Sequence, residues 1–507
     1  MSKNSLIINS SPSETRVALL ENGQPVEVYI ERRQSAGVVG NVYCGRVVRV
    51  LPGMQAAFVE IGLHRTGFLY VNDALPRSPD PVIPANGETA PAKGGNQGSR
   101  TQPLANIADV LKQGQEILVQ VQKEPIGTKG ARLTRHVTLP GRHIVYMPLF
   151  RHLGVSHRIE SEKERERLKK VLEPCMVNAD GFIVRTAAEG IEGDDIEREA
   201  KMLQQLWKDV EEDGKKGGAP RLVYADADLV MRATRDLFND QVGTIQVDRQ
   251  KDFQRIREFV KGFEPGRESG VELYDKPEPI FDHFGIEVEI ERALGRKVWL
   301  KSGGYIVIDQ AEALTVVDVN SGRFVGKSNL EETITRINLE AVKETAYQMR
   351  LRNIGGIIII DFIDMGEQAN REKVHAALEQ ALERDRAKTC IVRMSEIGLV
   401  EMTRKRVRES LGEVLTDACS YCNGRGFIKS EQTVGNEVLR GITRQLNRGE
   451  GNATILVNMH PSIADYLYEN ESEEIEQLEL SYKTSIIPVS REGYHQERFD
   501  IVTGTSA

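Results

Sequence analysis

Residues 303–365 constrain the fold more than any other segment, because they read as a strand–helix–strand unit. Two apolar runs, 305–308 and 314–317, are separated by a short turn and are typical of paired strands. Residues 357–360 are isoleucine throughout, as expected for a strand buried on both faces. A helix between the second and third runs would make those two strands parallel, with a right-handed crossover. The segment therefore predicts an α/β domain.

The helix itself carries start and stop signals. Ser328 followed by Glu331 fits a capping box at its beginning. Gly355 and Gly356 are placed to end it. Apolar residues that recur at helical spacing give it one buried face: Leu339, Val342, Ala346 and Met349.

Both strands that flank the helix end on a carboxylate, Asp318 and Asp361. Ligands of open α/β sheets bind at the carboxyl ends of parallel strands. Two carboxylates held there repel each other unless a proton or a cation lies between them, and Mg²⁺ commonly takes one or two carboxylates together with substrate phosphate. Asp is also a common turn residue, so either residue alone indicates a turn. Asn320 and Asp364 follow the two carboxylates within three residues, and with them the metal-site and turn interpretations are about equally favoured.

The length and composition exclude several classes of protein. A chain of 507 residues is long enough for three or four domains, and 40% hydrophobic with 28% charged residues is ordinary for a globular protein. The net charge of −8 argues against a uniformly basic nucleic-acid coat, so any RNA-binding surface must be local. Five scattered cysteines favour a reducing cytosol. No signal peptide or membrane span is apparent, and we expect a cytoplasmic protein.

Residues 38–72 are typical of a small β-barrel. Strands are expected at 42–50, 57–61, 67–69 and 118–122, a pattern that resembles the S1-type OB-fold, which binds single-stranded RNA. Phe58 and Phe68 are candidate platforms for base stacking, although phenylalanine in a strand more often belongs to the core. Residues 75–105, rich in Pro, Gly, Ala and Asn, predict a disordered insertion in a barrel loop.

A phosphate-binding turn is expected after the strand at 181–184. That strand leads into Arg185 and Thr186, and arginine binds phosphate through two parallel hydrogen bonds that a threonine hydroxyl can supplement. Taken alone, Arg185 is better explained as an exposed surface arginine. Residues 161–170 and 191–217 are charged runs that predict helices.

Two features follow the strand–helix–strand unit. Residues 401–408 are strongly basic, which suits either RNA phosphates or the wet face of a helix. Cys419 and Cys422 form a CxxC turn that offers two of the four ligands a structural zinc needs, so that a second chain would supply the rest. A redox pair and two unligated thiols are the alternatives. A helix near 434–446 and a strand near 454–457 are expected in the tail.

Taken together, the motifs resemble the ribonuclease E/G family of bacterial endoribonucleases over nearly the whole chain, with its ribonuclease G branch the nearer of the two. The segments that carry the resemblance are 52–59 (PGMQAAFV), 127–132 (GTKGAR), 185–190 (RTAAEG), 318–322 (DVNSG), 360–365 (IDFIDM) and the CxxC at 419–422.

The resemblance implies an α/β multidomain architecture. Its domains, in chain order, are an RNase H-like domain in two pieces at 1–38 and 230–294, an S1-type domain at 39–135, a 5′-sensor region at 136–229, a DNase I-like catalytic domain at 295–415, a zinc link at 416–426 and a small carboxyl-terminal domain at 427–507.

The resemblance also implies roles for individual residues. Asp318 and Asp361 would bind Mg²⁺, with Asn320 orienting Asp318. Residues that would contact RNA, including its 5′-monophosphate, are Phe58, Phe68, Lys129, Arg185, Thr186 and the backbone near Val145. Cys419 and Cys422 would share Zn²⁺ with a second chain in a homodimer, and further association is left open. Lys388 stands where the ribonuclease E pattern has an arginine, so 5′-end sensing is expected to be weaker or differently built.

These features predict a Mg²⁺-dependent endoribonuclease that cuts single-stranded RNA to 5′-phosphate and 3′-hydroxyl products. The family implies roles in 16S ribosomal RNA maturation and messenger RNA decay, with precursor rRNA and mRNA as substrates. The alternative is a non-catalytic RNA-binding scaffold, which would have no need of the carboxylate pair.

Overall fold

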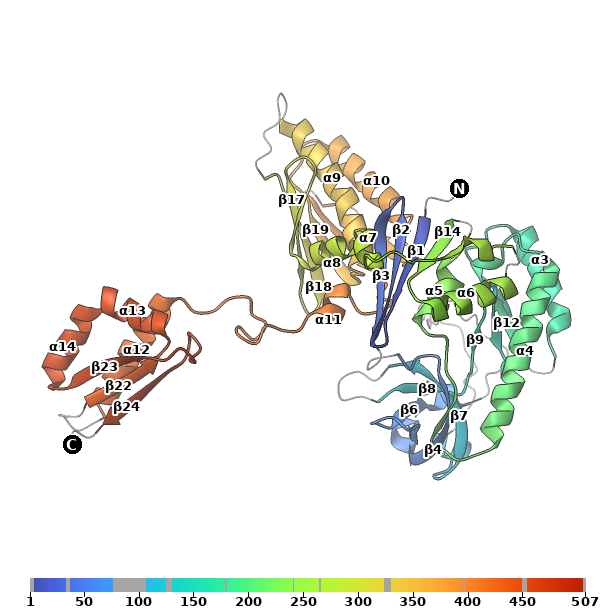
Figure 1. The fold of residues 1–507 in the computed structure, drawn as a ribbon, viewed down its shortest axis with the longest axis horizontal. Coiled ribbons are helices and arrows are strands. Elements are labelled where there is room, and N and C mark those ends of the chain that lie inside the picture. The colour runs from blue at the N-terminus through green and yellow to red at the C-terminus, as the bar shows by residue number, and fades with distance from the viewer. Residues whose placement is uncertain are drawn as a thin grey trace, which may run out of the picture. The chain divides into compact units, whose positions relative to one another are not determined.

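The computed structural model describes residues 4–32, 37–75, 106–124, 130–177, 180–239, 241–263, 266–322, 330–392, 394–395, 397–448 and 454–504. The chain divides into two compact units, Met1–Val414 and Leu415–Ala507, which are treated separately below. The first unit contains four sheets and the second contains one among these residues (Figure 1).

The first sheet joins the start of the chain to residues beyond 240. Its strands are β1 (Asn4–Ser10), β2 (Glu14–Glu21), β3 (Gln24–Arg32), β14 (Val242–Val247) and β15 (Val271–Leu273), in the order β15-β14-β1-β2-β3. β1 to β3 form an antiparallel meander, while β14 is parallel to β1. The helices that accompany it are α5 (Leu229–Leu237), α6 (Gln250–Phe263), α7 (Ile280–His283) and α8 (Ile286–Leu294).

The second sheet closes into a barrel, which confirms the strands expected between 42 and 122. The barrel strands are β4 (Val42–Leu51), β5 (Ala56–Glu60), β6 (Gly67–Tyr70), β7 (Glu116–Lys123) and β8 (Arg132–Thr134), and β4 pairs with β7 to close it. A later strand, β13 (Arg221–Tyr224), adds to β4. The short helices are η2 (Pro52–Met54), α1 (Val71–Ala74) and α2 (Ile107–Val110). The expected insertion lies, except for Leu75, outside the described residues.

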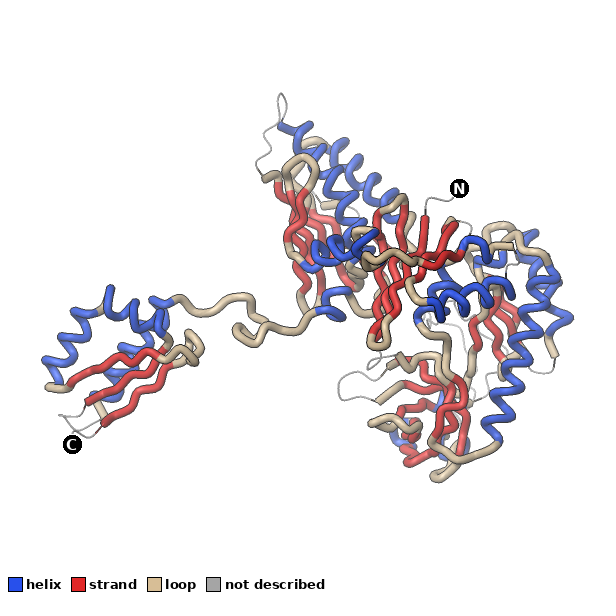
Figure 2. The backbone as a smooth tube through the Cα atoms, viewed as in Figure 1, coloured by secondary structure: helices blue, strands red, loops and turns tan. Residues whose placement is uncertain are grey.

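The third sheet is small and packs against two long helices, in contrast to the barrel, which is mostly strands (Figure 2). Its strands are β9 (Leu139–Pro140), β10 (Ile144–Met147), β11 (Leu153–Val155) and β12 (Gly181–Val184), in the order β11-β12-β10-β9. The helices are α3 (Glu162–Leu172) and α4 (Gly193–Lys215), which confirms both charged helices, and the short turns are η3 (Glu173–Cys175) and η4 (Thr186–Ala188).

The fourth sheet contains the strand–helix–strand unit. Its order is β16-β17-β18-β19-β21-β20, and β18 runs parallel to β19 as expected. Its elements are β16 (Lys297–Trp299), β17 (Tyr305–Gln310), β18 (Leu314–Asn320), α9 (Leu330–Leu351), β19 (Gly356–Asp361), α10 (Gln368–Leu382), β20 (Thr389–Ile391) and β21 (Leu399–Arg404). Helices α9 and α10 lie side by side against one face of the sheet (Figure 1).

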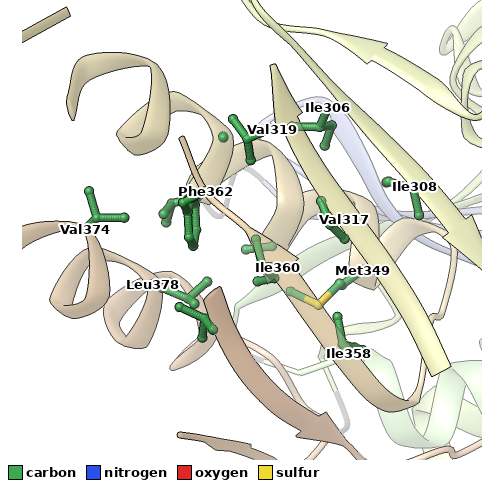
Figure 3. Packing of buried hydrophobic residues seen from close by; sticks show 14 of the residues in the cluster. Ile306, Ile308, Val317, Val319, Met349, Ile358, Ile360, Phe362, Val374 and Leu378 are labelled. Carbon is green, nitrogen blue, oxygen red and sulfur yellow. The ribbon is translucent and has the colours of Figure 1, made fainter. Parts of the chain in front are cut away.

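Two expectations about this unit were wrong in detail. β19 is buried on one face only: Ile358 and Ile360 point into the core, but Ile357 is 49% exposed on the opposite face. Figure 3 shows Ile358 and Ile360 gathered with Val317, Val319 and Met349, on the side that the helices cover. An all-isoleucine strand therefore does not by itself require two covered faces.

The end of α9 also differs from the expectation. The helix stops at Leu351, and Asn353 takes the left-handed conformation, with φ of 51°, that reverses the chain. Asparagine tolerates this conformation better than most residues, so it ends the helix two residues before Gly355. Ser328 of the expected capping box lies outside the described residues.

The basic segment 401–408 is not a helix face, because residues 401–404 lie in β21 and residues 405–408 are not helical. Arg404 is buried and forms an ion pair with Asp385 at 2.7 Å. Arg408 lies over the ring of Tyr29, 3.7 Å from its centroid, and donates to the carbonyl of Val28 at 2.6 Å. These two arginines join parts of the first unit, so the segment is not an available RNA-binding patch as a whole.

The second unit is a three-stranded sheet with helices. Its elements are α12 (Glu431–Leu446), β22 (Thr454–Met459), α13 (Pro461–Asn470), α14 (Ser472–Tyr482), β23 (Ser485–Ser490) and β24 (Phe499–Gly504), in the strand order β23-β22-β24, and α11 (Leu411–Leu415) precedes them. The helix and strand expected near 434–446 and 454–457 are confirmed. No helix in the described part of the chain is long and apolar enough to cross a membrane.

Candidate active site and RNA-binding surfaces

The two predicted carboxylates lie opposite each other on neighbouring strands. Asp318 of β18 and Asp361 of β19 are partners in the parallel register. Both are exposed, because the residues that alternate with them, such as Val317 and Ile360, fill the core on the other face. The amide Nδ2 of Asn320 donates to Oδ2 of Asp318 at 2.8 Å. The structure thus brings together all three residues that the sequence singled out.

The electrostatics of this pair favour a cation. Burial raises the pKa of Asp361, and the negative charges of Asp318 and Asp364 raise it further. Within the described residues, no group of three or more His, Cys, Asp or Glu side chains forms a complete metal cage. Two neighbouring carboxylates suit Mg²⁺, which commonly takes one or two carboxylates, keeps several waters and binds substrate phosphate. The donor set therefore fits the metal that the sequence predicted.

Two residues of α9 hold the loop after Asp361: Asn338, which the sequence analysis missed, and Glu331, which it assigned to a capping box. The fully buried Asn338 donates from Nδ2 to the carbonyl of Ile363 at 2.9 Å and accepts from its N–H at 3.1 Å. Glu331 accepts from the N–H groups of Gly366 and Glu367, each at 3.1 Å. Asn338 could have been noticed as a polar residue on the same helical stripe as Val342 and Met349.

An aromatic surface lies on the outside of the barrel. Phe58 and Phe68 stand 5.5 Å apart edge to face, and Phe68 stands 4.4 Å from Tyr70. All three are at least partly exposed, since their strand neighbours fill the barrel interior. The guanidinium of Arg132 lies 5.3 Å from the Tyr70 ring. Phe58 and Phe68 are therefore outer-face residues, and strand alternation from Phe68 would have added Tyr70. Lys129 lies outside the described residues.

Arg185 is held in place by its neighbours. Its Nη1 donates to the carbonyl of Gly141 at 2.7 Å, and its Nη2 lies 2.8 Å from Oδ1 of Asp236. Burial opposes the ionisation of Asp236, but its hydrogen bonds and charge contacts with Arg235 and Arg185 outweigh burial and lower its pKa. Arg185 is thus not a free surface arginine, and sequence reasoning missed its partner, which lies about fifty residues away in the chain.

The other predicted residues of this region surround the same turn. The Thr186 hydroxyl lies 3.0 Å from that of Ser156. Val145 is in β10, opposite Ile183 and Pro140 in the two neighbouring strands.

A buried contact between Glu199 and His143 supports the segment to which Arg185 is bound. Glu199 of α4 accepts from the N–H groups of Arg142 and His143 and lies 2.9 Å from Nδ1 of the His143 ring. The carbonyl of His143 in turn accepts from the N–H of Arg185 at 2.8 Å. Glu199 and His143 are both buried, and the sequence analysis singled out neither of them.

Lys388 lies in a loop that touches this region through its backbone. Arg158, in the turn after β11, donates to the carbonyl of Arg386 at 3.1 Å. The carbonyl of Lys388 accepts from the N–H of Lys405 at 2.9 Å, while its side chain is exposed. The loop around Lys388 is therefore adjacent to the turn between β11 and α3.

In the second unit, Cys419 and Cys422 form a turn suited to a metal. Backbone hydrogen bonds from Cys422 and Tyr421, together with the Cys422 side chain, lower the pKa of the exposed Cys419 thiol. The N–H of Gly426 donates to Sγ of Cys422 at 3.2 Å. A thiolate favoured in this way at Cys419 fits zinc, which binds the deprotonated form. The pair lies in coil before α12 rather than between a strand and a helix, which does not favour the redox alternative.

Comparisons with known proteins agree with this geometry. Residues 138–407 match the pattern described as the ribonuclease E/G family, and residues 418–504 match that described as the RNase E/G thioredoxin-like domain. The chain is 45% identical to ribonuclease G of Salmonella typhimurium (strain SL1344) and to that of Escherichia coli (strain K12), over 98% of this chain and 99% of each relative. It is 43% identical to ribonuclease G of Haemophilus influenzae, with the same coverage.

Proposed function

Because the chain belongs to the ribonuclease E/G family, we propose that it is an endoribonuclease of the ribonuclease G type that hydrolyses single-stranded RNA with Mg²⁺. The observation that carries the proposal is the pairing of Asp318 with Asp361 at the ends of two parallel strands, with Asn320 fixing the first carboxylate at 2.8 Å. A non-catalytic scaffold would gain nothing from two repelling carboxylates on an exposed sheet face.

In this proposal, the chain's own residues hold and orient the reacting groups. Asp318 and Asp361 would hold Mg²⁺ between them, and Asn320 keeps the Asp318 carboxylate in one orientation. When bound, Mg²⁺ supplies Lewis-acid polarisation of the scissile phosphate and an activated water for in-line attack. Asn338 keeps the backbone after Asp361 in place, so that the two carboxylates retain their spacing. The expected products carry a 5′-phosphate and a 3′-hydroxyl.

The remaining sheets support RNA binding by the same chain. The closed barrel, with Phe58, Phe68 and Tyr70 on its outside, supports an S1-type surface on which bases stack. The strand order of the first sheet, β3-β2-β1 followed by the parallel β14 and β15, supports the RNase H-like assignment. Arg185 and Thr186, with the backbone near Val145, form the proposed site for a 5′-monophosphate.

The proposal extends to cytoplasmic roles in 16S rRNA maturation and mRNA decay, and to a homodimer. Cys419 and Cys422 offer half of a tetrahedral zinc site, so two chains would share one Zn²⁺. Replacing both cysteines with serine should remove the zinc and shift the protein toward monomer. Metal analysis that gives one zinc per chain would contradict the shared site.

A cleavage assay tests the enzymatic proposal directly. A labelled single-stranded RNA is incubated with the protein in Mg²⁺ and in Mg²⁺ with excess chelator, and the product ends are mapped. We expect internal cuts with 5′-phosphate and 3′-hydroxyl ends in Mg²⁺ alone. Binding without cleavage under both conditions would favour the scaffold, and cleavage that persists in chelator would contradict the role of the carboxylate pair.

A further inference from the structure

An aromatic group lies on the exposed face of the fourth sheet, beside the carboxylate pair. Trp299 of β16 is 60% exposed and stands 5.3 Å from the ring of Tyr305 in β17. The Lys297 ammonium lies 4.1 Å from the Trp299 ring centroid and 3.5 Å from that of Tyr305. This platform, Lys297, Trp299 and Tyr305, belongs to none of the RNA-binding surfaces described above.

The strand register places the platform in line with the carboxylates. Lys297 pairs with Val307, which pairs with Asp318, which pairs with Asp361. Two residues further along β16, Trp299 pairs with Tyr305, which in turn pairs with Asn320, so these residues form a second row across the sheet. Paired residues share a face, so both rows point away from the helices. Neighbouring strands lie about 4.8 Å apart, so β16 is about 10 Å from β18, within the span of a short oligonucleotide.

The composition of the platform matches single-stranded RNA. An exposed indole offers a flat ring on which any base can stack, and an ammonium group held against aromatic rings can meet a phosphate. Among the described residues, Lys297 forms no ion pair and no hydrogen bond with a carboxylate, and its ammonium group contacts the two aromatic rings instead. The other tryptophan, Trp207, is 8% exposed and fills the core of the third sheet, so exposure is particular to Trp299.

We propose that Lys297, Trp299 and Tyr305 form a nucleobase subsite, in which a base next to the scissile phosphate stacks on Trp299 while Lys297 holds a neighbouring phosphate. The proposal rests on the proposed function, because the carboxylate pair fixes where the scissile phosphate lies. It commits to single-stranded RNA as the occupant, since this face is continuous with the carboxylates. A second copy of this chain is the competing occupant and is an outcome of the test.

The first test follows tryptophan emission in Asp318→Asn, which should bind RNA without cutting it. A short 5′-hydroxyl single-stranded RNA should quench the emission saturably, and the quenching should be lost in Asp318→Asn with Trp299→Phe. The same sequence as a blunt duplex, whose bases are already stacked, should quench much less. Emission that changes on dilution of the protein, and not on addition of RNA, would assign the face to a second copy and overturn the proposal.

The second test measures cleavage in the otherwise unaltered protein. Trp299→Ala should lower kcat/KM for single-stranded RNA by roughly 5- to 150-fold, the range expected for losing one stacked base. Trp299→Phe keeps a ring and should lose much less. Ile357→Ala is the matched control, because Ile357 is a half-exposed apolar residue on the same face at the far end of β19, and it should cleave like the parent.

The outcomes separate this inference from the proposed function. A parent that cleaves RNA, with Trp299→Ala equal to it and no RNA-dependent quenching, would overturn the subsite and leave the endoribonuclease assignment intact. A parent that fails to cleave would overturn the proposed function, and with it the scissile phosphate that the subsite adjoins. Equal losses in Trp299→Ala and Ile357→Ala would indicate a general effect of the sheet surface and would also overturn the subsite.

Discussion

The carboxylate pair and the Arg185 turn are both proposed to bind a phosphate of RNA, yet their charges are arranged in opposite ways. At the pair, Asp361 faces the like charges of Asp318 and Asp364, and the pKa of Asp361 is raised. At the turn, Arg185 already has an opposite charge at 2.8 Å, in Asp236, and the pKa of Asp236 is lowered. In the part of the chain that the structure describes, the carboxylate pair faces further negative charge, whereas the Arg185 turn contains a countercharge.

This difference determines how each site can respond to a ligand. A site of repelling carboxylates gains from any divalent cation and has no internal competitor to displace. An arginine that already forms an ion pair gains little binding energy from a phosphate, unless the phosphate replaces Asp236 or interacts with Arg185 more strongly than Asp236 does. The carboxylate pair should therefore behave as an absolute requirement for cleavage, whereas the Arg185 turn should modulate the rate.

The largest expected effect is at the carboxylate pair. Asp318→Asn or Asp361→Asn should lower kcat by about a thousandfold or more, because a metal contributes several kcal/mol to the transition state. RNA binding, measured by filter retention or anisotropy, should stay near that of the parent, since no basic or aromatic contact is removed. Near-normal cleavage by either variant would show that the pair is not the catalytic centre.

A smaller effect is expected at Arg185. RNA with a 5′-monophosphate should be cut faster than the same RNA with a 5′-hydroxyl or a 5′-triphosphate, and Arg185→Ala should erase most of that advantage. Losing one charge-assisted hydrogen bond costs about 1.5–3 kcal/mol, or about ten- to hundredfold. The rate on 5′-hydroxyl RNA serves as the internal control and should barely change. Equal parent rates on all three ends would rule out the sensor and direct attention to Lys388.

The variant Asp236→Asn shows whether Asp236 competes with the RNA phosphate for Arg185 or holds Arg185 in position to bind it. If Asp236 competes with the phosphate, the variant should increase the 5′-monophosphate advantage by about two- to fivefold, the scale of a partly exposed ion pair. If Asp236 instead positions Arg185, the advantage should fall, as in Arg185→Ala. Asp213→Asn is a suitable control, because it removes a carboxylate that pairs with a different arginine, Arg221.

The sequence predicted the carboxylate pair better than the arginine turn, for a physical reason. Asp318, Asn320 and Asp361 lie at the ends of strands whose apolar pattern sets the register, so local sequence places them together. The position of Arg185 depends on its ion pair with Asp236 of α5. It also depends on Glu199 of α4, which holds the 141–143 segment that Arg185 contacts. Those contacts depend on how separate sheets pack, which no periodicity reports.

The same limit explains the errors in the fold. Isoleucine at every position of β19 satisfied the pattern for a doubly buried strand, because that pattern does not say whether a second layer exists. The basic run at 401–408 has the composition of a solvated helix face. Its partners, such as Tyr29 and Asp385, come from other segments of the chain, so the local sequence does not reveal them. By contrast, the closed barrel and the αβ crossover, which rest on short-range periodicity, were predicted well.

The smallest expected effect is the pH dependence of the 5′-monophosphate advantage. The pKa of Asp236 is lowered, so its ionised form is favoured in the folded protein, and its contribution to stability is lost as the pH falls through that lowered pKa. Asp236 therefore keeps its negative charge at pH values above the ordinary range for an aspartate. The terminal phosphate takes its second negative charge near pH 6. The ratio of rates on 5′-monophosphate and 5′-hydroxyl RNA should then rise about threefold from pH 5.5 to 7.5 and level off, because only the phosphate titrates. Taking a ratio cancels the pH dependence of the chemical step, and Arg185→Ala should give a flat, low ratio throughout. A ratio that falls as the pH rises would mean that a group of the protein, rather than the phosphate, governs the contact.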